Sequence, residues 1–383
     1  MSDSISKTIQ DDYGGNSKFV VIILLVFIFI IVATALYYLY YMINLDAKEC
    51  KIMDSIYSEG NKYLHSLNFA DPDCQYTLKD YYIKTAYNCC SGGSYRNDFV
   101  DICNLKNIIK QGVRGLDFEL YSIEEQPVVA TSTDSNYNIK ETYNYVKFSD
   151  VMSTIMSYAF STGTSPSPND PIIIHLRIKS SNQNMFNNLA GIFRANSWRL
   201  LGPEYGSENR VCDNNTDQCY SKNLGNLKLQ DLQGKIILIV DRSNTDFMDN
   251  TEFYPYVNMT SNSMFMRCLT YYNTQYTPDM NELIEYNKKN MTIVIPDNKP
   301  NPENPSGIIC RAMGCQMMAI RYELEDTHLQ ENEIFFNGKG YSFILKPEEL
   351  RYKPIFIEET PPNNPLLNYA ERTSSSNYYS FQT

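Results

Sequence analysis

Histidine is scarce in this sequence of 383 residues, which contains only His65, His175 and His328. No set of cysteines and histidines has the spacing of a zinc site, so a zinc-binding module is excluded. His65 and His328 fall outside the predicted strand ends and are expected on the surface. His175 lies within a predicted strand and is the histidine to consider for chemistry.

Clusters of basic residues are also absent. The 33 Lys and Arg residues against 44 Asp and Glu residues give a formal net charge of −11. Nucleic-acid binding requires a positively charged stripe, so we expect no nucleic-acid partner. Attraction to anionic lipid by charge alone is excluded for the same reason, and any lipid contact would need a pocket or an anchor.

One segment has no charged side chain at all: residues 19–43 read FVVIILLVFIFIIVATALYYLYYMI. A helix needs about 20 apolar residues to cross the ~30 Å hydrocarbon core, so this segment predicts a single-pass transmembrane helix. Tyr37, Tyr38, Tyr40 and Tyr41 crowd its C-terminal end, where aromatic rings favour the headgroup region. The alternatives are a buried core helix or a signal peptide, although a signal peptide has a shorter apolar part that ends at small residues.

The orientation of this helix is not defined by the sequence. Lys7 and Lys18 precede it, and Lys48 and Lys51 follow it, whereas the positive-inside rule needs an asymmetry. The side of the membrane on which the rest of the chain lies therefore stays open.

The ten cysteines are too few for a disulfide scaffold. Cys89 and Cys90 are adjacent, and Cys212 and Cys219 flank an Asn/Asp-rich loop that they could bridge in an oxidising compartment. The redox compartment itself is left open.

Beyond residue 80, strand-like and helix-like segments alternate, which is typical of βα units around a parallel sheet. Several of the strands are continuous Ile/Val/Leu runs, as in parallel strands buried on both faces. Eight strands predict an α/β fold, a (β/α)8 TIM-type barrel, although an open doubly wound sheet has the same local pattern. Strands are expected at 81–86, 115–121, 127–131, 172–178, 235–240, 292–295, 316–321 and 342–345, and helices at 104–111, 148–160 and 184–195.

Four stretches in chain order carry a resemblance to a known family. They read YYIKTAYNCCSGGS (81–94), GVRGLDFELY with PVV (112–129), PIIIHLRIK with LQGKIILI (171–239), and MGCQMMAIRYE with NGKGYSFILKPEELR (313–351). They resemble the X and Y halves of the catalytic barrel of phosphoinositide-specific phospholipase C. The fourth is the most specific, because it is similar to the family's GCQMVALNF and GYVLKP…LR in order. The resemblance implies a phosphodiesterase-like barrel.

The chain is accordingly expected to divide into seven parts. These are a disordered tail (1–18), the transmembrane helix (19–43), a juxtamembrane helical segment (44–77), an X-like half barrel (78–242), a linker or insertion (243–283), a Y-like half barrel (284–353) and a second disordered tail (354–383).

The resemblance places Tyr87 and Thr131 at the positions of the family's two catalytic histidines. A phenol with a pKa near 10 is a poor base at neutral pH, and threonine does not titrate usefully. His175 is the candidate substitute, because it lies two residues from Arg177 and on the same face of its strand. The alternative is a hydrogen-bonded histidine deeper in the barrel.

The resemblance also places Asn88, Asp117 and Glu119 at three calcium-ligand positions, and the fourth is Arg177. A guanidinium does not ligate a cation, and its charge opposes one in the same pocket. We therefore expect Arg177 to pair with Asp117 and Glu119, and we expect no cofactor, with calcium left as the alternative.

Basic residues for the substrate phosphates are few. Arg242 and Lys299 are the cations nearest to the family's phosphate-binding positions, and together with Arg177 they are weak substrate-binding candidates.

Two functions are compatible with these residues. The favoured one is a membrane-anchored, catalytically inactive phospholipase C-like barrel that serves as a binding or structural module for a phospholipid or protein partner. The alternative is a phosphoric diester hydrolase acting on phosphatidylinositol or glycerophosphodiesters through His175, Arg177, Asp117 and Glu119. Abundant Asn, Ile, Lys and Tyr suggest an AT-rich genome, such as that of a large DNA virus, which would place the single-pass protein in a virion or host membrane.

Overall fold

The protein is described by a computed structural model that covers residues 2–133, 139–207, 210–212, 219–221, 223–354 and 371–382. Residues 1–351 form one compact unit and residues 352–383 a second. The second unit contains a hairpin of β14 (Thr373–Ser375) and β15 (Ser380–Gln382), so the expected disordered tail is partly ordered. Tyr379 and Phe381 stack in this hairpin with ring centroids 5.8 Å apart, and residues 355–370 lie outside the described residues.

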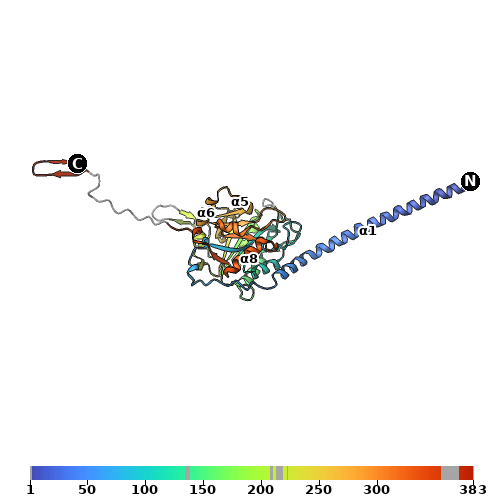
Figure 1. The fold of residues 1–383 in the computed structure, drawn as a ribbon, viewed down its shortest axis with the longest axis horizontal. Coiled ribbons are helices and arrows are strands. Elements are labelled where there is room, and N and C mark those ends of the chain that lie inside the picture. Colours follow the sequence, from blue (N-terminus) through green and yellow to red (C-terminus); the bar gives the residue numbers. More distant parts are fainter. Residues whose placement is uncertain are drawn as a thin grey trace. The chain divides into compact units, whose positions relative to one another are not determined.

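Eight parallel strands form a nearly closed barrel in the first unit, which confirms the predicted fold class (Figure 1). Their order is β10-β11-β12-β1-β2-β5-β8-β9, and residues 262–265 connect β9 and β10 at the two ends of this path. The strands are β1 (Tyr81–Ala86), β2 (Gly115–Ile123), β5 (Ile172–Ile178), β8 (Ile236–Asp241), β9 (Met259–Ser261), β10 (Met266–Thr270), β11 (Met291–Ile295) and β12 (Met317–Ile320).

Two of the predicted barrel strands are not part of the parallel barrel. β3 (Gln126–Val129) pairs antiparallel with β2, and β13 (Phe343–Leu345) pairs antiparallel with the start of β1. Their places are taken by β9 and β10, which lie in the segment expected to be a linker (243–283), so that prediction was wrong. β9 is only a Met-Thr-Ser segment, and neither strand carries the Ile/Val run by which the others were found.

The helices follow the strands along the chain, and the three predicted ones are present. Polar N-cap residues begin them: the side chain of Asp101 accepts a hydrogen bond from the backbone at the start of α2, and Asn182 does so at α4. The helices are α2 (Ile102–Lys110), α3 (Phe148–Thr154) with a π-helical turn at Ile155–Ala159, α4 (Gln183–Ala195), α5 (Tyr271–Gln275), α6 (Met280–Lys289), α7 (Gly307–Ala312) and α8 (Thr327–Lys339). Three short strands complete the fold: β4 (Val146–Lys147), β6 (Arg210–Cys212) and β7 (Cys219–Ser221).

The apolar core has two layers, because side chains alternate along each strand. Phe118 and Leu176 point outward into the cluster between strands and helices. Ile173 and Ile239 point inward and fill the barrel. The residues of β2 and β5 that carry charge alternate with this outward set and therefore face the barrel interior.

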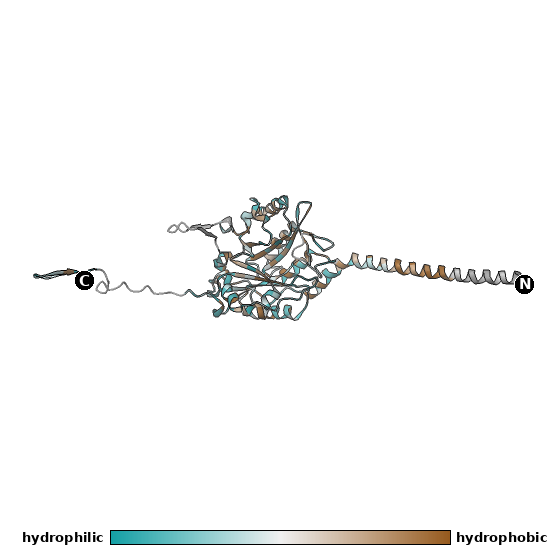
Figure 2. Cartoon of the chain, turned by 90° about the horizontal axis from the view of Figure 1, so that it is seen from above, coloured by the Kyte–Doolittle hydropathy of each residue, from teal (hydrophilic) through white to brown (hydrophobic). Residues whose placement is uncertain are grey.

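The N-terminal element is α1 (Ser2–Ile56), one helix that is continuous through the expected boundaries at residues 18 and 44. Its segment Phe19–Leu45 is exposed, and is long and apolar enough to cross a membrane by length and composition. Figure 2 shows this segment as a continuous hydrophobic stretch.

The last turns of α1 are part of the barrel. Met53 and Tyr57 are buried in the layer between strands and helices, and the Tyr57 hydroxyl donates a hydrogen bond to the Tyr322 carbonyl (2.7 Å). A disulfide joins Cys50 of α1 to Cys103 of α2, a pair that the sequence analysis did not predict.

We expect the Cys103→Ser variant to lose about 2–5 kcal/mol of unfolding free energy, because the disulfide restricts the unfolded chain. Denaturant unfolding of the full chain in detergent would measure the loss, and a reductant should lower wild-type stability to the same level. Cys268→Ser removes an unpaired, partly buried thiol and is the control. Equal stability of the wild type with and without reductant would contradict the prediction.

Candidate active site

The candidate site lies at the carboxyl end of the barrel strands. β2 contributes Asp117 and Glu119, and the neighbouring β5 contributes His175 and Arg177. The strand register places Asp117 beside His175 and Glu119 beside Arg177. Residues two apart on a strand share a face, so all four side chains point into the barrel in two successive layers.

Arg177 occupies the centre of this site. Its Nη2 donates to Asp117 Oδ2 (2.9 Å) and to Asn88 Oδ1 (2.6 Å), and its Nη1 donates to Glu119 Oε2 (3.1 Å). The guanidinium is only 6 % exposed, and both carboxylates are buried. The predicted pairing of Arg177 with Asp117 and Glu119 is confirmed.

Tyr87 stacks on this arginine. The Arg177 guanidinium carbon lies 4.6 Å from the Tyr87 ring centroid, and the Tyr87 ring meets that of Tyr95 edge-on at 5.6 Å. The Thr131 hydroxyl donates to the Tyr95 carbonyl (3.1 Å). Burial raises the pKa of the Tyr87 phenol, so this side chain remains protonated at neutral pH. Tyr87 and Thr131, which the resemblance places at the two histidine positions, therefore serve packing in this structure.

A second arginine closes the site beside the first. The Arg321 guanidinium carbon lies 4.7 Å from the Tyr95 ring centroid, and its Nε donates to Glu323 Oε1 (2.7 Å). Both side chains are almost fully buried. In the sequence, Arg321 and Glu323 are recognisable only as part of the MAIRYE motif, because no local pattern places them against Tyr95.

His175 lies one layer deeper, as the second interpretation of this residue predicted. Its Nδ1 lies 2.7 Å from Asp117 Oδ1, and its Nε2 lies 2.8 Å from Ser261 Oγ. All three residues are fully buried. Ser261 ends β9, within the segment expected to be a linker, and no pattern in that segment indicates a site residue.

The charges in this cluster are set by burial and by Arg177. Burial opposes ionisation of Asp117, but the guanidinium and the His175 hydrogen bond outweigh it and lower the pKa of Asp117 to about 2. Burial raises the pKa of Glu119 even though Arg177 opposes the shift. One guanidinium therefore compensates a carboxylate that is ionised at neutral pH and a second one that ionises less readily.

These residues do not fit a calcium ion. Calcium takes six to eight oxygen ligands, whereas oxygens of Asn88, Asp117 and Glu119 accept hydrogen bonds from a side chain that is itself a cation. Within the described part of the chain, the Cys, His, Asp and Glu side chains close enough to share a metal are Cys50, Asp101 and Cys103. Two of these three are joined in the disulfide.

The weak phosphate-binding candidates lie at the rim. Arg242 directly follows β8, Lys299 follows β11, and both side chains are exposed. In the described residues neither is hydrogen-bonded to the cluster around Arg177, so their role stays a prediction.

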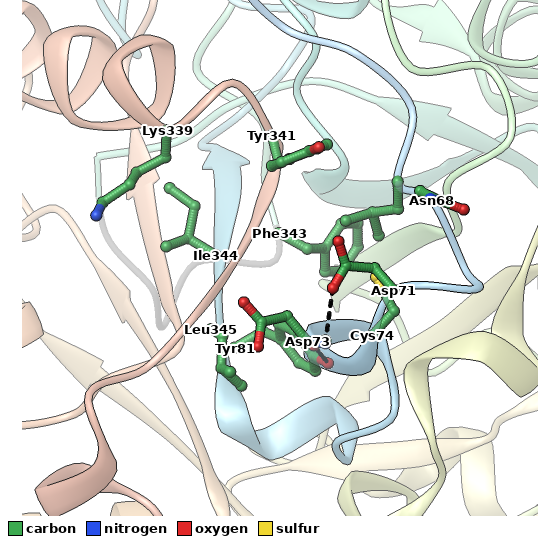
Figure 3. A pocket seen from close by; sticks show the side chains of 11 residues that line it. Asn68, Asp71, Asp73, Cys74, Tyr81, Lys339, Tyr341, Phe343, Ile344 and Leu345 are labelled. Carbon is green, nitrogen blue, oxygen red and sulfur yellow. Dashed lines mark hydrogen bonds between the residues drawn. The ribbon is translucent and has the colours of Figure 1, made fainter.

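A separate cavity lies at the opposite end of the barrel (Figure 3). It has a volume of about 230 Å³ and adjoins Tyr81 at the start of β1, whereas Tyr87 follows the end of that strand. Asp71, Asp73 and Lys339 supply its charged groups. Active sites of such barrels lie at the carboxyl ends of the strands, so this cavity is not the candidate site.

The acidic pair and the arginine thus lie at the carboxyl ends of neighbouring strands of a parallel (β/α)8 barrel. Residues 242–349 match the model of the phosphatidylinositol-specific phospholipase C, Y domain. Among curated proteins none matches. The resemblance inferred from the sequence is therefore confirmed for the Y half and for the fold.

Solved structures share the barrel at low sequence identity. S. officinalis PLC21 aligns with a TM-score of 0.57 and 18 % identity over 76 % of this chain and 40 % of that chain. L. pealei PLC21 aligns with a TM-score of 0.56 and 17 % identity over 73 % of this chain and 38 % of that chain. A calcium-dependent phosphoinositol-specific phospholipase C from Pseudomonas sp. aligns with a TM-score of 0.41 and 12 % identity over 69 % of this chain and 95 % of that chain. The chain thus spans about 40 % of the length of the PLC21 proteins.

We expect Arg177→Met to lower the unfolding free energy by about 3–5 kcal/mol, because it leaves buried carboxylates without a partner. The matched control is Arg267→Met, which breaks an ion pair with Glu282. In that pair the Arg267 side chain is 33 % exposed and the Glu282 side chain is 51 % exposed. Solvent screening should limit that loss to about 0–1 kcal/mol. Denaturant unfolding measures both, and equal losses would contradict a special role for Arg177.

Acid should weaken the fold through Asp117. Its pKa is about 2 in the folded protein and about 3.9 in an unfolded chain, so its contribution is complete above pH 4 and is lost as the pH falls towards 2. The loss amounts to about 2 kcal/mol. Urea unfolding at pH 5 and pH 2.5 measures this loss. Between these two pH values the unfolding free energy should drop less for Asp117→Asn than for the wild type. The raised pKa of Glu119 acts with the opposite sign, so Glu119→Gln should not reduce the drop.

Proposed function

We propose that this protein is a membrane-anchored, catalytically inactive phospholipase C-like barrel that serves as a binding or structural module. The observation that carries the proposal is the closed cluster around Arg177. Its guanidinium binds the oxygens of Asn88, Asp117 and Glu119 where the family resemblance implies calcium.

The loss of proton-transfer groups supports the same conclusion. A positioned general acid or base contributes about 10²–10⁴-fold to a rate, and Tyr87 and Thr131 supply neither. Tyr87 and Tyr95 instead pack with the two arginines at the barrel mouth. A barrel that keeps its framework and buries its reactive face in ion pairs suits recognition of a protein or phospholipid by its outer surface.

Membrane anchoring is supported by α1. Phe19–Leu45 is apolar and exposed, and the same helix continues into residues buried in the barrel. A cleaved signal peptide would have no need of such continuity. The composition rich in Asn, Ile, Lys and Tyr supports our further suggestion that the membrane is that of a large DNA virus or its host.

One observation favours the alternative, a phosphoric diester hydrolase. Ser261, His175 and Asp117 form a hydrogen-bonded chain of hydroxyl, imidazole and carboxylate, the order in which nucleophile, base and orienting acid stand in many hydrolases. The complete burial of these three residues beneath Arg177 argues against hydrolysis, because a substrate would first have to displace the ion pairs of Arg177.

Hydrolysis assays on the full chain in detergent separate the two functions. Phosphatidylinositol and glycerophosphodiesters are supplied with calcium or with a chelator, and an active phospholipase C is the positive control. We expect no turnover and no effect of calcium on the melting temperature. Turnover that is abolished in His175→Ala and Ser261→Ala would overturn the inactive assignment.

A gain-of-function variant checks the reason for inactivity. The triple variant Tyr87→His, Thr131→His, Arg177→Glu restores the residue types that the resemblance implies. We expect calcium to raise its melting temperature but not that of the wild type. A calcium response of the wild type equal to that of the variant would contradict the proposed closure by Arg177.

A further inference from the structure

The Cys50–Cys103 disulfide bears on the side of the membrane that the barrel occupies. We infer that the barrel faces an oxidising, extracytosolic compartment and that the residues before Phe19 face the cytosol. Cys50 follows the apolar segment Phe19–Leu45 within the same helix, so it emerges on the side of the barrel. Only the statement that the residues before Phe19 face the cytosol rests on the proposed membrane anchor.

The two cysteines are held in bonding position by contacts that do not depend on their oxidation. Their Cα atoms are 6.0 Å apart, within the range that a disulfide requires. α1 is fixed beside α2 by buried Met53 and by a hydrogen bond from Asn107 Nδ2 to Asp54 Oδ1 (2.7 Å). Formation of the bond therefore depends on the compartment rather than on a conformational change.

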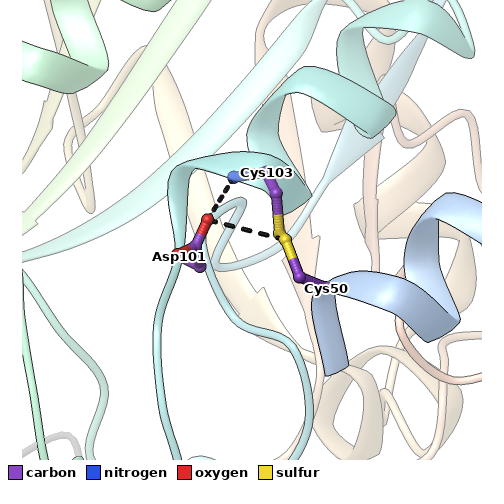
Figure 4. A group of neighbouring side chains, drawn as sticks. All are labelled: Cys50, Asp101 and Cys103. Atoms are coloured by element: carbon purple, nitrogen blue, oxygen red, sulfur yellow. Dashed lines mark hydrogen bonds between the residues drawn. A yellow bond between two sulfur atoms is a disulfide. The ribbon is translucent and has the colours of Figure 1, made fainter. Parts of the chain in front are cut away.

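A metal site is the other use for this group of side chains (Figure 4). Asp101 Oδ1 lies 3.8 Å from Cys50 Sγ, but it already accepts a hydrogen bond from the backbone N–H of Cys103 (2.6 Å) as the N-cap of α2. Structural zinc takes four ligands, and in the described residues the group offers three. The geometry therefore favours the disulfide.

A second cysteine pair points in the same direction. In the β6–β7 hairpin the antiparallel register places Cys212 directly opposite Cys219. Facing residues of an antiparallel pair have Cα atoms about 4.5–5.5 Å apart, which suits a disulfide. This is the pair that the sequence analysis had singled out.

The unpaired cysteines of the described residues are mostly buried in the core. Burial raises the pKa of the Cys90 thiol and raises that of Cys315 to about 12, so neither forms the reactive thiolate at neutral pH. The structure thus joins Cys50 to Cys103 and buries most of the other cysteines whose burial it describes. Such pairs persist in oxidising compartments and are kept reduced in the cytosol.

The reaction is a thiol–disulfide exchange. The Cys50 and Cys103 thiols lose two protons and two electrons and form one S–S bond. The electrons pass to the disulfide of an oxidoreductase in that compartment, which is reduced to a dithiol.

The test uses the full chain in cells. Free thiols are blocked with N-ethylmaleimide during lysis, disulfides are then reduced, and newly released thiols are labelled with a maleimide-polyethylene glycol. We expect the wild type to take up the maleimide-polyethylene glycol label only after reduction. Labelling should be lower than in the wild type for Cys103→Ser and equal to the wild type for Cys268→Ser. A cross-linked Cys50–Cys103 peptide in wild-type protein, found by mass spectrometry, keeps the test valid if the variant misfolds.

Topology is read separately, by protease digestion of sealed microsomes carrying the chain with a tag at each end. We expect the C-terminal tag to be protected and the N-terminal tag to be digested. Glycosylation of Asn258 is a poorer readout, because this residue of an Asn-Met-Thr sequon is buried and accepts a hydrogen bond from the Leu238 N–H (2.9 Å). Free Cys50 and Cys103 thiols in cells, or a digested C-terminal tag, would overturn the inference.

Carbonate extraction distinguishes failure of the anchor from failure of the inference. Release of the protein by carbonate, with Cys50 and Cys103 still oxidised, would refute the anchor and leave the oxidising compartment standing. Retention in the membrane with reduced Cys50 and Cys103 would support the anchor and refute the oxidising compartment.

Discussion

The site depends on one buried guanidinium that pairs with two carboxyl groups. Removing charges from water costs several kcal/mol per ion, and Arg177 offsets part of that cost by bonding to both Asp117 and Glu119. The same arginine fixes Asn88 by a hydrogen bond and Tyr87 by stacking. Arg177 of β5 therefore holds β2 and the segment that follows β1 in place, and its charge is the opposite of that of the ligand which the resemblance implies at its position.

The hydrogen bonds that continue from this cluster also help to close the barrel. In the described residues β9 and β10 share no ladder pairing, and the backbone bond at this point is the one from the Ser263 N–H, between the strands, to the Met266 carbonyl of β10 (3.0 Å). Ser261 at the end of β9 is bonded to His175 of β5, and His175 is bonded to Asp117 of β2. This chain crosses the interior and ties β9 to strands on the other side of β8. The arrangement that resembles a catalytic relay thus also has a structural purpose.

Sequence patterns predicted the features that depend on local chemistry. The Ile/Val runs of β5 and β8 were visible because strands buried on both faces must be apolar, and the Arg177 pairing followed from strand alternation and charge. β9 and Ser261 were missed because a strand of three residues is specified by its neighbours in the barrel, and β10 was missed because its five residues contain no Ile/Val run. Tyr95, Arg321 and the Cys50–Cys103 pair depend on contacts between segments far apart in the chain, which no local pattern contains.

The junction between α1 and the barrel determines where the module operates. Leu45 ends the apolar segment, and Cys50 is already bonded to α2. Five helical residues rise about 7.5 Å, which is close to the thickness of one headgroup layer. If Phe19–Leu45 spans a bilayer, the barrel begins at the lipid surface with no flexible tether. If the barrel is the binding module that we propose, it meets its partners at the membrane surface rather than at a distance from it.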